Sequence, residues 1–141
     1  MRLGRTGDRT TTIINLAGIL WMQFGLTRDR SDLNQSIEYY REALNLIPGE
    51  HQDRPALLYN LAVSLHTRFE KTEDKNDIDN VIEYYREAVN LRPEGHQDMP
   101  ELLSSLGLAL RVRSRLTGDR SDFDQGIEYQ CEAISLLPER Q

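Results

Sequence analysis

Apolar residues recur at three- and four-residue steps in the middle of the chain, the spacing that places side chains on one face of an α-helix. The first such run follows Pro55 and consists of Leu57, Leu58, Leu61, Leu65 and Phe69. It predicts a helix of about 18 residues. Pro55 suits the first turn of this helix because its missing N–H would have no partner there, and Asp53 is placed to act as the N-cap.

A second run follows the polar segment TEDKND. Its apolar residues are Ile78, Val81, Ile82, Tyr85, Ala88 and Val89. Pro93 ends the run, and a proline there predicts the end of a second helix. No segment alternates with the two-residue period of a β-strand, so we predict two helices joined by a short polar turn and no strands.

The same pattern occurs three times along the chain. IEYYREALNLIP begins at Ile37, IEYYREAVNLRP at Ile82 and IEYQCEAISLLP at Ile127, a spacing of 45 residues each time. A fixed period of roughly 20 to 50 residues indicates stacked supersecondary units. We therefore predict an all-α fold, an α-solenoid of three antiparallel helical hairpins with six helices. Residues 1–141 would form a single array, with repeats at approximately 8–52, 53–97 and 98–141.

Small residues and turns fit this arrangement. Gly118, in the break TGDRSD, can adopt the left-handed conformation that ends a helix. Small residues at paired positions allow two antiparallel helices to approach closely. We expect the small residues of the first helices to lie opposite those of the second helices, pairing Ala17, Ala62 and Gly107 with Ala43, Ala88 and Ala133.

The amino-acid composition limits which classes of binding partner and which cellular compartment we expect for this chain. The chain is 38% apolar and 28% charged, as in an ordinary globular protein. Its net charge of -6 and pI near 5.1 disfavour nucleic acid, because neutralising phosphates requires a basic surface. No run of apolar residues is long enough to span a membrane, and the start, MRLGRTGDRTTT, is not a secretory leader. Cys131 is the only cysteine, so a reducing, cytoplasmic location is expected.

The repeated residues resemble those of a known family. The segment NLA, from Asn15 to Ala17, followed by SIEYYREALNLIP from Ser36, is similar to the tetratricopeptide repeat. That repeat places a small residue in its first helix, alanine and an aromatic residue in its second, and proline afterwards. The 45-residue period is longer than the usual repeat of about 34 residues. It resembles the long-period tetratricopeptide arrays of large fungal and bacterial proteins.

This resemblance implies a protein- or peptide-binding groove on the concave face, lined by the first helix of each repeat. Mapping the first helices onto that face nominates eight principal residues, namely Asn15, Trp21, Met22, Tyr59, Asn60, His66, Arg111 and Arg115. The neighbouring candidates on the same helices are Ile14, Gly18, Val63, Thr67, Glu70, Ser104, Ser105 and Leu108. Trp21, His66 and Arg111 occupy one equivalent position and are expected to form a row across the groove.

Structural roles compete with binding roles for several of these residues. Trp21 is as well suited to covering the open end of the first hairpin as to anchoring a ligand. His51 and His96 are repeat-equivalent loop residues, for which turn stabilisation is favoured over metal binding, because neither has a ligand partner close in sequence. No nucleophile with a base and no phosphate-binding glycine loop is present, so no enzymatic activity and no cofactor are predicted.

Two functions fit these observations. The first is a non-enzymatic interaction module whose groove binds a peptide or a partner helix. With Trp21, Met22 and Tyr59 at one end and Arg111 and Arg115 at the other, the expected ligand has an apolar anchor and an acidic flank. The second is an architectural or self-association segment of a longer tetratricopeptide array, with no specific ligand in the groove.

Self-association would use the terminal hairpins. The last predicted helix ends its apolar stripe with Ile134, Leu136 and Leu137, and no polar capping helix follows these residues in the sequence.

Overall fold

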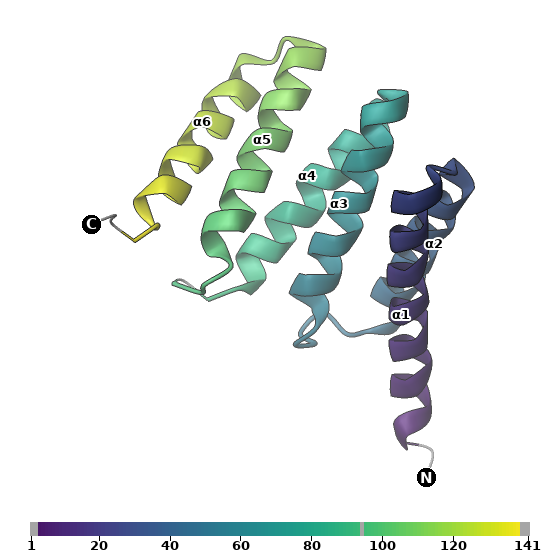
Figure 1. Cartoon of the computed structure of the whole chain (residues 1–141). Helices are drawn as coiled ribbons and strands as arrows, with labels where there is room; N and C mark the ends of the chain where they lie inside the picture. The colour runs from purple at the N-terminus through teal and green to yellow at the C-terminus, as the bar shows by residue number, and fades with distance from the viewer. Residues whose placement is uncertain (1–2, 94, 139–141) are drawn as a thin grey trace.

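The structure is a computed structural model that describes residues 3–93 and 95–138. Its helices are α1 (Leu3–Thr27), α2 (Arg30–Leu46), α3 (Arg54–Thr72), α4 (Lys75–Leu91), α5 (Met99–Thr117) and α6 (Arg120–Ser135). No β-strand occurs within the described ranges. The predicted α-solenoid of three antiparallel hairpins is confirmed, with α1 and α6 at opposite ends of the array (Figure 1). The last three residues of the expected third repeat, 139–141, lie outside the described residues.

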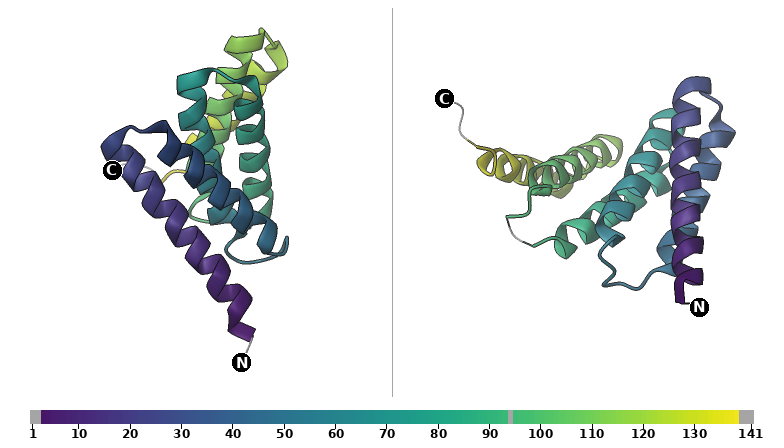
Figure 2. Two further views of the ribbon diagram at one scale, coloured as in Figure 1. Left: turned by 90° about the vertical axis from the view of Figure 1, so that its right-hand side faces the viewer. Right: turned by 60° about the horizontal axis from the view of Figure 1, so that its bottom comes forward.

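The hairpins stack in chain order. The two helices of each hairpin pack together, and successive hairpins meet through α2 with α3 and through α4 with α5. Figure 2 shows the stack from two further directions, with α1 and α2 at one end and α5 and α6 at the other. The second helices lie side by side in one layer, where Arg86 of α4 donates a hydrogen bond to Gln125 of α6 at 3.0 Å. The first helices form the other layer.

The first and second helices of the hairpins begin in different ways. Each second helix has an aspartate N-cap whose carboxylate accepts backbone N–H groups of the first turn, at Asp29, Asp74 and Asp119. Helix α3 has Pro55 in its first turn, as predicted. Asp53 stands at the N-cap position but its side chain makes no capping hydrogen bond, so that part of the prediction is wrong. Its backbone N–H instead donates to Nδ1 of His51 at 3.0 Å.

The first helices end in left-handed residues. Gly118 has the expected positive φ of 82°. Arg28 and Glu73 occupy the equivalent positions with φ of 60° and 57°. A side chain in this region carries a steric cost that glycine avoids, so two of the three turns are strained where the third is not.

The small residues set the spacing inside each hairpin, but in a register different from the one expected. Ser36 Oγ donates to the carbonyl oxygen of Ala17 at 2.7 Å, and Gly107 faces Gly126 so closely that a Cβ on Gly107 would lie 2.7 Å from the Gly126 carbonyl oxygen. Ala17 and Gly107 therefore face positions 36 and 126 of the second helices. Ala133 packs at the other end of its hairpin, with Met99 and Leu103.

Buried ion pairs join the repeats. Arg68 of α3 binds the carboxylate of Asp77 in α4 through two hydrogen bonds of 2.9 Å, and it also reaches Asn34 of the preceding hairpin at 3.1 Å. Arg113 repeats this arrangement one hairpin later, with Asp122 at 2.7 and 3.0 Å and Asp79 at 2.9 Å. Because each arginine contacts its own hairpin and the one before it, it fixes their relative position as well as neutralising a buried carboxylate.

Candidate peptide-binding groove

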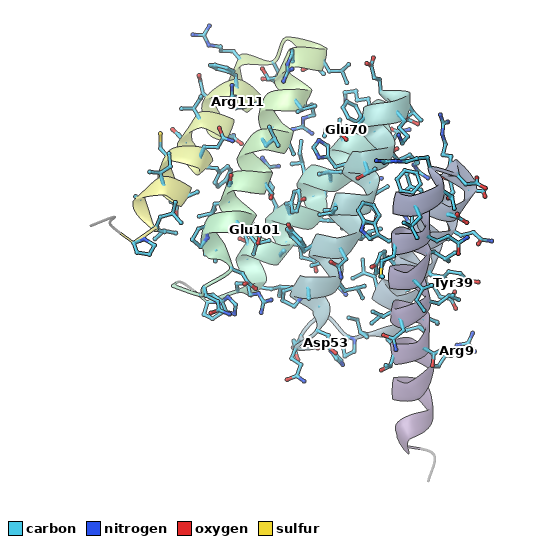
Figure 3. The ribbon with its side chains drawn as sticks, viewed as in Figure 1. Arg9, Tyr39, Asp53, Glu70, Glu101 and Arg111 are labelled. Atoms are coloured by element: carbon cyan, nitrogen blue, oxygen red, sulfur yellow. The ribbon has the colours of Figure 1, made fainter. Side chains whose placement is uncertain are left out.

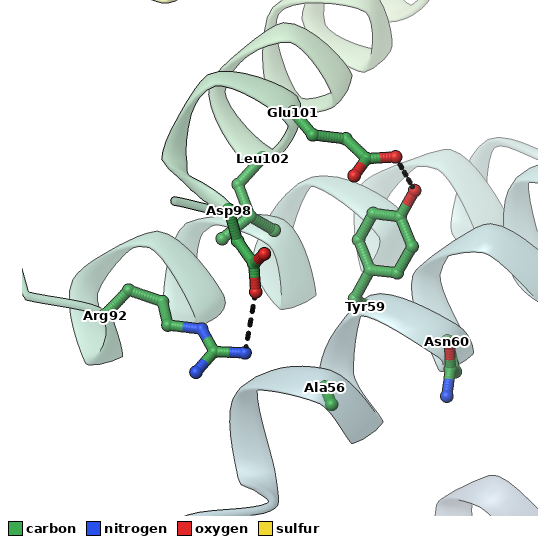
Figure 4. Close-up of a pocket in the computed structure, with 7 residues that line it drawn as sticks. All are labelled: Ala56, Tyr59, Asn60, Arg92, Asp98, Glu101 and Leu102. Atoms are coloured by element: carbon green, nitrogen blue, oxygen red, sulfur yellow. Dashed lines mark hydrogen bonds and ion pairs between the residues drawn. The ribbon is translucent and has the colours of Figure 1, made fainter. Parts of the chain in front are cut away.

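Two separate pockets lie between α3 and α5, one near each end of these helices, and we call the surface that carries both pockets the α3–α5 groove. The first pocket, of about 130 Å³, lies near the start of both helices (Figure 4). It is lined by Ala56, Tyr59, Asn60, Arg92, Asp98, Glu101 and Leu102. The second pocket, of about 270 Å³, lies near the end of both helices and is lined by Phe69, Glu70, Glu73, Val112, Arg115 and Leu116.

Hydrogen bonds organise the first pocket. Tyr59 Oη donates to Glu101 Oε2 at 2.8 Å and so joins α3 to α5, while Arg92 Nη2 donates to Asp98 Oδ2 at 3.0 Å (Figure 4). The ring of Tyr59 also packs against the ring of Tyr85, with centroids 5.9 Å apart. Burial and the adjacent Glu101 carboxylate raise the pKa of Tyr59 to about 12. Tyr59 is therefore a protonated donor at neutral pH, and Asn60 beside it is exposed to a ligand.

The second pocket combines an apolar floor with charged walls. Phe69 is buried, and Val112 and the 43% exposed Leu116 complete the apolar surface. Glu70 and Glu73 stand on the α3 side and Arg115 on the α5 side. In the described part of the chain neither glutamate forms an ion pair. Two carboxylates beside one guanidinium give this end of the groove a mixed, partly acidic character, which corrects the expectation of a basic end.

Arg111 and Arg115 contact different helices. Arg111 Nη1 donates to Gln130 Oε1 of α6 at 3.1 Å, and its Cγ lies against Gly126 of α6. Figure 3 shows Arg111 on the α6 side of α5, whereas Glu70 rises from α3. Of the two arginines predicted to line the groove, Arg115 lines the pocket that α5 shares with α3 and Arg111 packs within its own hairpin.

The expected row of Trp21, His66 and Arg111 is divided among separate neighbours. Trp21 is partly buried on Phe24, with ring centroids 6.2 Å apart. His66 stacks on Phe69 with centroids 6.5 Å apart and an interplanar angle of 18°. Each of these two aromatic contacts lies within one helix.

The last two of the eight principal residues lie on α1. Asn15 and Met22 are both exposed, Met22 at 68%. They belong to the same face of the first-helix layer as Asn60, but they lie on the hairpin before the α3–α5 groove.

Several groove residues were not nominated from the sequence. Arg92 and Asp98 come from the connection between α4 and α5, and Glu101 and Leu102 from the first turn of α5. A sequence signal was present at Arg92, since the equivalent residues, Ile47 and Leu137, are apolar. A charged residue at an otherwise apolar repeat position indicates a local function or a local polar contact.

Turn stabilisation by the loop histidines is confirmed. Nδ1 of His51 and Nδ1 of His96 each accept the backbone N–H of the residue two positions later, at 3.0 Å in both loops. Among the residues the structure describes, no group of three potential metal ligands occurs.

No protein-family model matches this chain, and no curated protein is significantly similar to it. The class that the structure itself defines is an all-helical repeat protein, with hairpins stacked as a solenoid. In the described residues no helix is both long and apolar enough to cross a membrane.

Proposed function

We propose that this chain is a non-enzymatic interaction module that holds an extended segment of a partner protein in the α3–α5 groove. The observation that carries the proposal is the pair of pockets between the two helices. One has hydrogen-bonding side chains in its lining, including exposed Asn60, and the other has the apolar floor of Phe69, Val112 and Leu116. Extended ligands are held by alternating anchor pockets and hydrogen-bonding groups, and this groove offers both. The resemblance to tetratricopeptide repeats supports the same use of the first helices.

The charges of the groove specify the ligand further. Its two pockets contain four carboxylates, on Glu70, Glu73, Asp98 and Glu101, and two guanidiniums, on Arg92 and Arg115. Arg92 is already paired with Asp98, which leaves the carboxylates in excess. Opposite charges steer and orient a partner, so we propose a ligand with an aliphatic anchor flanked by lysine or arginine. This replaces the acidic flank expected from the sequence.

The one cysteine of the chain bears on the cellular compartment of the protein. A single cysteine, Cys131, is exposed on α6, and an exposed free thiol is best preserved in a reducing environment. We propose the cytoplasm on this ground.

Fluorescence anisotropy with two labelled peptides tests the ligand. Both peptides carry a central leucine, one flanked by lysines and the other by glutamates. The lysine peptide should bind more tightly, and Leu116→Asn should weaken its binding by about tenfold because the anchor pocket becomes polar while its charge is unchanged. The double variant Glu70→Lys with Glu73→Lys should reverse the preference between the two peptides.

A matched control separates the groove from overall charge. The double variant Glu83→Lys with Glu128→Lys makes the same charge change at exposed positions of α4 and α6, outside the groove. It should retain the parent's preference, apart from a small shift that added salt removes. If the control and the groove variant change binding equally, or if neither peptide binds saturably, the proposed function is wrong.

A further inference from the structure

The two ends of the array expose the residues that form the stacking interfaces inside it. Position 37 of α2 and its equivalent in α4 are fully buried against the next hairpin, as Ile37 and Ile82. The equivalent residue of α6, Ile127, is 39% exposed. The same comparison holds one turn earlier, where Ile78 is fully buried and Phe123 is 41% exposed.

The end of α6 shows which of its apolar residues belong to this face. Ile134 is 69% exposed, whereas its equivalent Leu44 is 8% exposed against α3. Leu136 differs, because it is 44% exposed and its equivalent Leu91 is already 38% exposed inside the array. Leu137, which follows α6, is 55% exposed where its equivalent Ile47 is 8% exposed. The stacking face of the last hairpin, which we call the C-face, therefore consists of Phe123, Ile127, Ile134 and Leu137. It excludes Leu136, which the sequence analysis had included.

The opposite end presents the complementary half. Leu16 of α1 is 37% exposed, whereas the equivalent Leu61 and Leu106 are fully buried by the preceding hairpin. Ile19 is 58% exposed where Ser64 is 1% exposed. We call Leu16, Ile19 and Gln23 the N-face.

We propose that the N-face of one copy of this chain binds the C-face of a second copy, so that the chains stack head to tail and continue the solenoid. The argument is continuity with an interface seen twice, since α2 with α3 and α4 with α5 use the same repeat positions that the two faces leave open. The N-face carries a larger apolar side chain than the internal interfaces at one position, because Ile19 stands where they have Ser64 and Ala109. Larger side chains are accommodated by a wider helix spacing, within the range of about 8–10 Å seen for packed helices.

One polar contact of the internal interfaces is incomplete at the ends. Inside the array, Arg113 joins Asp122 of its own hairpin to Asp79 of the one before. At the N-face the equivalent residue is Gln23, which donates to Asp32 at 3.1 Å. At the C-face the acceptor equivalent to Asp79 is Asp124, which is exposed and paired at 3.7 Å only with Arg120 among the described residues. Head-to-tail stacking would bring Asp124 beside Gln23 of the next copy.

This geometry makes a directional interface, in which the two partners contribute different surfaces. Such an interface propagates beyond a dimer unless the rotation closes a ring. The proposal concerns the ends of the stack and is independent of any ligand in the α3–α5 groove.

Sedimentation velocity over a concentration series tests the proposal. The parent chain should form dimers and larger species as its concentration rises. Ile134→Glu and Ile19→Glu should each weaken self-association by about tenfold or more, since each places a charge in an apolar contact. Both residues are more than half exposed in the single chain, so circular dichroism should show that both variants fold. Leu136→Glu is the matched control and should associate like the parent.

Mixing establishes the direction of stacking. Ile134→Glu blocks the C-face and Ile19→Glu blocks the N-face, so each variant alone should be monomeric while an equimolar mixture forms a dimer and nothing larger. If Ile19→Glu alone still dimerises, two C-faces meet each other and head-to-tail stacking is wrong. A parent chain that stays monomeric at every concentration also overturns the proposal.

A gain of affinity provides an independent test. Gln23→Arg restores the side chain found at the equivalent positions 68 and 113, and it should tighten self-association severalfold by binding Asp124 of the preceding copy. Adding Asp124→Asn should remove most of this gain. If Gln23→Arg leaves association unchanged, the register we propose is wrong.

Discussion

The close approach of α5 and α6 makes a testable statement about two glycines. Gly126 lies where an added Cβ would stand 2.6 Å from Arg111 Cγ and 2.8 Å from the carbonyl oxygen of Gly107. The arginine side chain can turn away, but the carbonyl belongs to the backbone of α5. Gly126→Ala therefore requires the two helices to separate. Gly18 of α1 has only Tyr40 Oη near its Cβ position, at 3.8 Å, which is ordinary contact.

The expected change in the free energy of unfolding of each variant follows from two opposing effects. Alanine is favoured over glycine in a helix by roughly 0.5–1 kcal/mol, and this gain applies to both sites. Overpacking a close contact costs about 1–3 kcal/mol, and a fixed backbone oxygen places Gly126 near the upper end. We expect Gly126→Ala to lower the free energy of unfolding by about 2 kcal/mol and Gly18→Ala to raise it by about 0.5–1 kcal/mol.

Guanidinium denaturation followed by far-ultraviolet circular dichroism measures both variants against the parent. Hydrogen exchange of the α6 amides is the second readout, because stability in a stacked array is partly local and α6 has a neighbour on only one side of the stack among the described helices. Gly126→Ala should speed exchange in α6, while Gly18→Ala should leave α6 unaffected. If both variants are stabilised alike, the close approach of the two helices is not a packing constraint and the reasoning fails.

Three further predictions concern the ion pairs and turns. Arg113→Gln should lower the free energy of unfolding by about 2–3 kcal/mol in urea, because glutamine replaces a two-bond ion pair to buried Asp122 with one hydrogen bond. Glu73→Gly should raise it by about 1 kcal/mol, measured in the same way, since glycine adopts the observed positive φ without strain. Burial alone would raise the pKa of Asp79, but hydrogen bonds from Lys75 and Arg113 outweigh it and lower the pKa. A lowered pKa contributes stability that is present above about pH 4 and lost as the pH falls through the folded value, so the stability difference between the parent and Asp79→Asn should shrink on acidification.

The helices and their pairing were predictable because they depend on spacing within short segments. The run from Leu57 to Phe69 defines one helical face whatever surrounds it, and a 45-residue period requires every hairpin to pack like its neighbours. Gly118 was predictable for the same reason, since a positive φ at a helix end is a local property.

Contacts between helices were predicted less well. Helical periodicity states which side of a helix a residue occupies, but it does not fix the offset of one helix along another. The predicted register of the small residues was therefore wrong, because Gly107 faces Gly126 and not Ala133. Arg111 was predicted to lie in the groove, although its side chain donates a hydrogen bond to α6. A one-turn difference on α5 decides whether an arginine faces α3, as Arg115 does, or its own hairpin.

The buried carboxylates show a signal that was overlooked. Aspartate is normally exposed, so the sequence alone indicates that Asp77 is an exposed residue of the polar turn. Its buried state depends on Arg68, nine residues earlier, and the same separation joins Arg113 to Asp122. A charged pair that repeats with the period of the fold indicates a structural contact, because an interface copied in each hairpin requires the same partners each time.

The α3–α5 groove and the two end faces differ in how their residues vary between equivalent positions of the repeats. Groove positions change between repeats, as Glu70 and Arg115 occupy equivalent sites with opposite charge, so the groove presents a different surface to each part of an extended ligand. End-face positions stay apolar at most sites, which suits a contact that repeats. Head-to-tail stacking would place α5 of one copy near α1 of the next copy. The layer of first helices would then continue into the next copy, where Met22 of α1 is exposed. A ligand confined to the α3–α5 groove would then bind independently of stacking, whereas a longer one would contact two copies and so favour the stacked state.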